Sequence, residues 1–117
     1  MTIELLIKKY KENEIVIPSF QRKYVWKEKK ASKFIESFLL GLPIPQIFLF
    51  REAKNQDLLV VDGQQRLKSI LYFFDGKFED GKIFKLKDVR DQWEGKTYGD
   101  LTESDKRRLK NMLQSLI

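Results

Sequence analysis

The sequence predicts a compact α+β domain, in which a small mixed sheet is flanked by helices. Short apolar runs typical of strands alternate with longer segments whose apolar residues recur at helical spacing. Two of the predicted strands are neighbours in sequence and favour a hairpin, which argues against a regular doubly wound sheet. No repeat, low-complexity tract or linker divides the 117 residues, so we expect one domain spanning residues 1–117.

The N-terminal part of the chain predicts a capped helix followed by a short strand. Thr2 is a suitable cap, Asn13 a plausible stop, and residues 14–17 read as a strand that Pro18 ends. The apolar residues of the helix are Ile3, Leu6, Ile7 and Tyr10.

The middle of the chain predicts an amphipathic helix and then a hairpin. The helix ends near Gly41 and Pro43, and strands at 46–51 and 58–61 are joined by the polar turn around 53–56. The apolar stripe of this helix consists of Ala31, Phe34, Ile35, Phe38, Leu39 and Leu42.

The run from Leu58 to Arg66 reads as a buried strand that turns at Gly63 into a helix. The helix is indicated by Leu67, Ile70, Leu71 and Phe74, and it ends near Asp75-Gly76. Gln64, Gln65 and Arg66 then occupy the first turn, where backbone N–H groups and the positive end of the helix dipole favour a phosphate. Arg66 adds a forked charge, and Asp62 faces a cation that accompanies the phosphate.

The C-terminal third predicts a small hairpin and a last helix. Residues 78–86 contain the turn Asp80-Gly81, and Thr102 to Asp105 resemble a capping box. The last helix has an apolar stripe at Leu109, Met112, Leu113 and Leu116, where the chain stops, so we expect a domain truncated at its C-terminus.

Composition restricts the chemistry that the chain can perform. The chain has no cysteine and no histidine, so it cannot form a thiolate or imidazole metal site, a disulfide, or a catalytic triad that uses either residue. A net charge of +6 favours phosphate-bearing partners without distinguishing a nucleotide from DNA or RNA. No signal peptide or membrane-length apolar run is present, which favours a cytoplasmic protein with no membrane partner.

A second polar and aromatic cluster, at residues 17–26, fits neither a helical nor a strand period. Gln21 and Arg22 are its candidate ligand-binding residues, whereas we assign Phe20 and Trp26 to the core. The charged runs at 27–30 and 105–108 are interpreted as solvated helix faces rather than DNA contacts. Two site-like clusters in one small domain predict a shared site.

Three motifs together resemble the N-terminal domain of the GmrSD-type family of modification-dependent restriction and phage-defence proteins. They are Ile17-Pro18-Ser19-Phe20-Gln21-Arg22-Lys23-Tyr24-Val25-Trp26, Gly41-Leu42-Pro43-Ile44-Pro45 and Val61-Asp62-Gly63-Gln64-Gln65-Arg66. Through this family the chain is similar to the ParB and sulfiredoxin superfamily. The resemblance implies binding and hydrolysis of a nucleoside triphosphate with Mg²⁺, coupled in longer relatives to a separate DNA-cutting domain.

The resemblance also gives the site residues their expected roles. Gly63, Arg66, Arg22 and Gln21 bind the nucleotide, with Asp62, Gln64 and Gln65 as the catalytic set. Asp62 is in addition the expected Mg²⁺ ligand.

Two alternatives stay open: a non-catalytic DNA-binding module that uses the basic surface, and a fragment of a ParB-like nuclease. We expect no DNA cleavage by this chain alone, because Asp62 is its one well-placed carboxylate.

Overall fold

The computed structural model describes residues 2–17, 23–45, 47–51 and 57–116, and every structural statement below concerns these residues. Their sheet has three strands in the order β1-β3-β2, formed by Ile15–Val16, Leu58–Asp62 and Phe48–Arg51. The central strand β3 pairs in parallel with β1 and antiparallel with β2. The expected α+β class and mixed sheet are therefore confirmed, as is the hairpin of β2 and β3.

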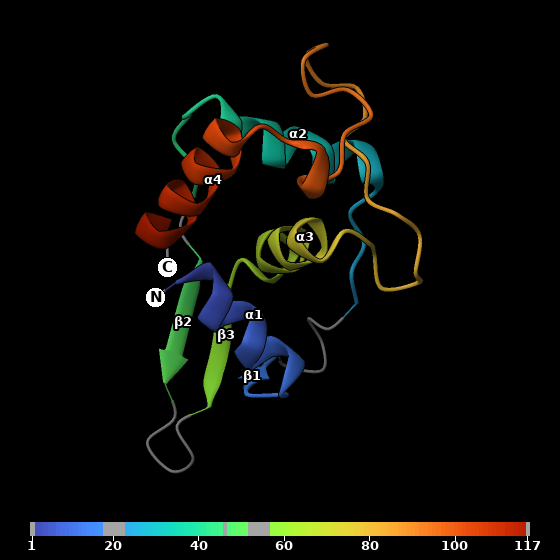
Figure 1. Cartoon of the computed structure of the whole chain (residues 1–117). Coiled ribbons are helices and arrows are strands. Elements are labelled where there is room, and N and C mark those ends of the chain that lie inside the picture. The colour runs from blue at the N-terminus through green and yellow to red at the C-terminus, as the bar shows by residue number, and fades with distance from the viewer. Residues whose placement is uncertain (1, 18–22, 46, 52–56, 117) are drawn as a thin grey trace.

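Helices cover the sheet in two layers. Figure 1 shows α1 (Ile3–Lys11) beside the strands, and α3 (Gln64–Asp75) between the sheet and the outer pair, α2 (Glu28–Leu39) and α4 (Glu103–Leu116). A short 3-10 helix, η2 (Tyr98–Asp100), leads into α4 and contacts α3. The α3 helix directly follows the central strand and contacts α2. Its start therefore lies between the sheet and the outer helices.

One apolar core joins these layers. Val60 of the central strand and Phe73 of α3 are fully buried. The helices α1, α2 and α4 also contribute fully buried side chains. The largest fully buried side chains are Phe38, Phe73, Phe84, Leu6, Ile35, Leu39, Leu67, Ile70, Leu86, Leu109, Leu113 and Val60. Burial of this apolar surface is the main stabilising contribution to the fold. The α3 helix is buried from Leu67 to Phe73, directly after its first turn.

The ends of the helices follow local rules. Thr2 caps α1 by accepting a hydrogen bond from the Leu5 amide at 3.1 Å, and Asn13 adopts a positive φ of 59° just beyond the helix. The second helix begins at Glu28, before its apolar stripe, because the Ala31 amide bonds the Lys27 carbonyl at 3.0 Å. The charged run 27–30 is thus its first turn.

The segment between α3 and α4 is mostly irregular. The expected hairpin at 78–86 is reduced to a turn closed by a single bridge between Lys77 and Ile83. A reciprocal capping box between Thr97 and Asp100, which we did not anticipate, orders η2. The Thr102 cap of α4 is confirmed by its hydrogen bond from the Asp105 amide, at 3.1 Å. None of the described helices is long and apolar enough to span a bilayer.

Candidate functional site

The strand-to-helix turn has the backbone geometry of an anion cradle. Gly63 is the N-cap of α3 with φ 85° and ψ 25°, in the left-handed region that favours glycine. The first intrahelical backbone bond runs from the Leu67 amide to the Gly63 carbonyl, at 2.9 Å. The amides that precede Leu67 therefore point out of the helix start, and no side chain of the described residues caps this end. Such an end attracts negative charge.

The side chain of Arg66 closes over this turn. A Cβ atom added to Gly63 would lie 3.0 Å from Arg66 Nη2 and 3.3 Å from its Nε, and 3.2 Å from Ile47 Cγ1. Position 63 thus requires glycine both for its positive φ and for the space that the guanidinium occupies. The result is a positive fork beside the Gly63 turn, and its role in binding a phosphate stays a prediction.

The Gln65 side chain connects α3 to the loop at residues 23–26. Its Oε1 accepts hydrogen bonds from the amides of Val25 and Trp26, at 3.0 and 3.2 Å, and its Nε2 donates to the Lys23 carbonyl at 2.8 Å. One side-chain amide therefore forms hydrogen bonds with both N–H groups and a carbonyl group in the backbone of a loop about forty residues away in sequence. Sequence reasoning assigned Gln65 to orient water or ligand, and the contacts give it a positioning role that no local pattern reveals.

A second link fastens the same loop one helical turn later. The Ser69 hydroxyl donates to the Gln65 carbonyl at 2.8 Å and lies 2.8 Å from the Tyr24 hydroxyl. Because Ser69 has a single hydroxyl hydrogen, Tyr24 is the donor in that pair. Burial raises the pKa of Tyr24, with the Ser69 hydrogen bond acting in the opposite direction, so the phenol stays protonated and able to donate at neutral pH. Two consecutive turns of α3 thus hold the loop.

Gln64 supplies a polar atom that is still available at this site. Its side-chain Oε1 is buried and accepts no hydrogen bond from the part of the chain that the structure describes. An acceptor kept from both water and a donor is costly, by about 1–3 kcal/mol, and such atoms are enriched where a ligand or water belongs. Gln64 therefore presents an acceptor beside the Gly63 turn.

Three of the expected site residues lie partly or wholly outside the described structure. Gln21 and Arg22 belong to the undescribed segment 18–22, and for Asp62 only the backbone, as the last residue of β3, is described. The loop that directly follows Arg22 does meet the first turn of α3 through Gln65. The shared site of the two clusters stays a prediction for these three side chains.

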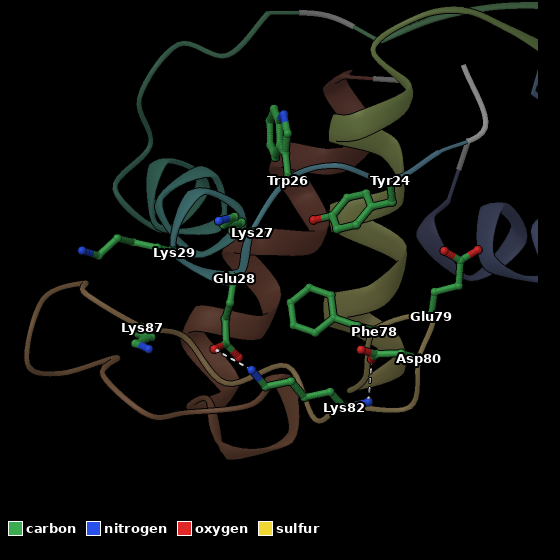
Figure 2. Close-up of a pocket in the computed structure, with 10 residues that line it drawn as sticks. All are labelled: Tyr24, Trp26, Lys27, Glu28, Lys29, Phe78, Glu79, Asp80, Lys82 and Lys87. Carbon is green, nitrogen blue, oxygen red and sulfur yellow. Dashed lines mark hydrogen bonds and ion pairs between the residues drawn. The ribbon is translucent and has the colours of Figure 1, made fainter. Parts of the chain in front are cut away.

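A hollow beside α3 was not anticipated from the sequence. It is an open groove of about 760 Å³ between the start of α2 and the turn at 78–82 (Figure 2). Tyr24 and Phe78 form its aromatic floor, with ring centroids 6.3 Å apart. Its lining is Tyr24, Trp26, Lys27, Glu28, Lys29, Phe78, Glu79, Asp80, Lys82 and Lys87. No sequence period would have joined residues 24–29 with 78–87.

The charged runs at the helix starts are engaged in more contacts than a solvated face requires. Lys30 lies over the Trp26 ring at 4.9 Å, and Glu28 pairs with Lys82 at 3.6 Å. In α4, Asp105 accepts from the Trp93 indole at 3.0 Å, and Arg108 Nη1 donates to the Leu39 carbonyl at 3.0 Å. The side chains of both runs are nevertheless exposed or only partly buried, as expected for solvated helix faces, so these contacts add to that interpretation. Trp26, assigned to the core, is only partly buried against it.

The acidic side chains do not form a metal centre among the described residues. No group of three or more histidine, cysteine, aspartate or glutamate side chains gathers within that part of the chain. The chemistry carried by the described site is thus cationic and amide-based, centred on the first turn of α3.

A strand, a positive-φ glycine and an arginine-bearing helix start are thus combined in this small α+β domain. The chain belongs to the family described as the N-terminal domain of GmrSD restriction endonucleases, which matches residues 3–117. It is also similar to an uncharacterized protein, MJ0686, of Methanocaldococcus jannaschii, with 31% identity over 91 aligned positions. That alignment covers 57% of this chain and 16% of the relative, so the chain spans a small part of that protein's length. No solved structure gives a significant match.

Proposed function

We propose that the chain binds a nucleoside triphosphate with Mg²⁺ at the start of α3 and acts as the regulatory module of a modification-dependent DNA restriction system. The observation that carries this proposal is the Arg66 guanidinium over Gly63, within 3.0 Å of the position that a Cβ would occupy. The cradle combines outward-pointing amides, the helix dipole and a forked cation, which together favour a phosphate chain. Family membership supplies the restriction context.

The roles of the site residues follow from their chemistry. Gly63 and the first-turn amides hold the phosphates, while Arg66 and Arg22 neutralise them, with Gln21 nearby in sequence. Asp62, at the end of β3, holds Mg²⁺ directly or through a water, because hard cations prefer carboxylate oxygens. The buried acceptor of Gln64 suits a donor from the ligand or from a water molecule.

Hydrolysis is the reaction that this arrangement supports. Water attacks the γ-phosphorus, and the bond to the oxygen bridging the β-phosphate breaks, which releases inorganic phosphate and a nucleoside diphosphate. Positioned charge provides most of the stabilisation in such a reaction. Gln64 is the candidate for orienting the water, whereas the Gln65 amide is committed to the loop backbone and acts by holding that loop against the site.

Calorimetric titration of the 117-residue chain with ATP and GTP in the presence of Mg²⁺ tests this proposal. We expect saturable binding that persists at physiological salt, because forked hydrogen bonds at a partly closed site are screened less than surface charge. A chain that binds DNA with a steep salt dependence and shows no affinity for nucleotides would instead favour the non-catalytic DNA-binding alternative.

A further inference from the structure

The groove is connected to the first turn of α3 through the backbone of Trp26, one of its lining residues. At one end, the Trp26 amide donates a hydrogen bond to Gln65 Oε1 of the first turn, at 3.2 Å, and at the other end Phe78 follows the last turn of α3. Figure 2 shows Tyr24 lying in front of the helix between these two residues. The aromatic lining of the groove is therefore tied to the helix turn that directly follows Gly63.

The aromatic residues of the groove are held in place before a ligand arrives. Tyr24 is fixed by its hydrogen bond to Ser69 and by an edge contact with Tyr72, and Phe78 is stacked on Phe84 with centroids 4.3 Å apart. Trp26 packs edge-on against Phe34 and lines both the groove and the hollow on its other side. Rings that are already ordered lose little conformational entropy when a planar group stacks on them.

The rim of the groove carries donors and acceptors in similar numbers. Lys27 and Lys82 contribute ammonium groups, and Glu28 and Asp80 contribute carboxylates, with Glu28 paired to Lys82 across the groove (Figure 2). This mixture is unlike the uniformly cationic lining that a phosphate backbone requires. It suits the polar edge of a nucleobase, which presents donors and acceptors side by side.

We propose that this groove holds the base of the nucleotide, with Trp26 as its stacking residue and with a preference for purines, whose ring surface is larger. The inference rests on the proposed function, since the phosphates at Gly63 place the base. Stacking of a base on an aromatic side chain contributes about 1–3 kcal/mol, which corresponds to roughly 5- to 150-fold in affinity. Binding of the base then depends on Trp26, whereas binding of the phosphates does not.

The test compares Mg²⁺ complexes of ATP, CTP and inorganic tripolyphosphate by calorimetry, using the full chain and the variant Trp26→Ala. We expect ATP to bind about tenfold more tightly than tripolyphosphate, with CTP between them, and Trp26→Ala to abolish the difference while leaving tripolyphosphate affinity unchanged. Val25→Ala is the matched control, because Val25 lies on the same loop, is 62% exposed and does not line the groove.

The outcomes separate the two proposals. Equal affinities for ATP and tripolyphosphate in the unmodified chain, or an equal loss for all ligands in Trp26→Ala, would overturn the base site while the phosphate site stands. Trp26-dependent binding of ATP without any binding of tripolyphosphate would support the groove and reject the phosphate site. Absence of all binding would reject both.

Fluorescence of the unmodified chain provides a measurement that does not depend on folding of the variant. Trp26 is partly buried beside the groove, whereas Trp93 is 3% exposed and donates to Asp105, so it gives a constant background. ATP should quench the tryptophan emission and tripolyphosphate should not. Emission that stays constant at saturating ATP would overturn the proposed stacking.

Discussion

The guanidinium of Arg66 lies directly over the α-carbon of Gly63, so that a Cβ at position 63 would contact Nη2 at 3.0 Å. Two residues of one turn are therefore mutually dependent: the glycine leaves the space, and the arginine fills it with positive charge. This relationship links a backbone requirement to an electrostatic one, and it sets the first prediction.

Arg66→Ala should weaken binding of Mg²⁺-ATP by about 1.5–3 kcal/mol, the range for charge-assisted hydrogen bonds. Gly63→Ala should weaken it as well, because an L residue is strained at φ 85° and its methyl group displaces the guanidinium. Calorimetry measures both effects, with circular dichroism to confirm folding. Arg107→Ala, which removes the same charge from an exposed position of α4, is the control and should leave affinity unchanged.

Arg22 and Arg66 should be energetically coupled if both contact one phosphate chain. A double-mutant cycle on ATP affinity, with Arg22→Ala and Arg66→Ala, should give a coupling energy above about 0.5 kcal/mol. Additive losses would show instead that Arg22 acts apart from the site. The hydrogen bonds of Gln65 to residues 23, 25 and 26 make this coupling a reasonable expectation, because they hold the chain that follows Arg22 against α3.

Gln65→Ala should lower the free energy of unfolding by about 1–3 kcal/mol, because it leaves the three backbone groups bonded to this amide without their partner. Gln65→Glu should be similarly harmful, since it removes the donor to the Lys23 carbonyl and places a negative charge beside it. Urea denaturation gives the stability, and proteolysis between residues 22 and 27 should accelerate in both variants. Exposed Gln92→Ala serves as the control, and equal protection of the loop in all variants would contradict the positioning role.

Tyr72 should make the fold sensitive to alkaline pH. Burial, followed by the neighbouring charges of Tyr10 and Glu79, raises the pKa of Tyr72 well above the usual value of 10.0. The stabilisation tied to its neutral form is complete below about pH 10 and is lost as the pH rises further, because the unfolded phenol then ionises more readily than the folded one.

The variant Tyr72→Phe should therefore lose less stability than the unmodified chain between pH 10 and 12 in thermal denaturation. At pH 7 it should be at least as stable, since the hydroxyl is buried without a hydrogen bond from the described residues. A parallel decline of both proteins above pH 10 would show that another group titrates there.

The chain alone should leave plasmid DNA intact, whether or not the DNA is modified, with Mg²⁺ or Mn²⁺ present. Phosphodiester cleavage by metal ions needs several converging carboxylates, and Asp62 is the single candidate at the predicted site. Agarose gel electrophoresis of treated plasmids gives the answer. Reproducible nicking that disappears in Asp62→Ala would favour the nuclease alternative.

Much of the fold was predictable because its signals are local. Thr2 and Thr102 cap helices through hydrogen bonds to residues three positions later, and sequence reasoning identified both. The hairpin of β2 and β3 was likewise visible from two apolar runs separated by a polar turn. Where local signals were mixed, the expectation was less accurate: the hairpin expected at 78–86 is reduced to a turn with a single bridge between Lys77 and Ile83.

By itself, the sequence determined the turn at which the candidate site is built. A buried strand, Gly63 with its positive φ, and a helix whose first turn contains Arg66 follow from backbone sterics and apolar periodicity within ten residues. Only the tertiary structure decided what surrounds that turn. The bonds of Gln65 to residues 39–42 positions away, and the groove shared by Trp26 and Phe78, depend on how distant segments pack, and such contacts leave no periodic signal in the chain.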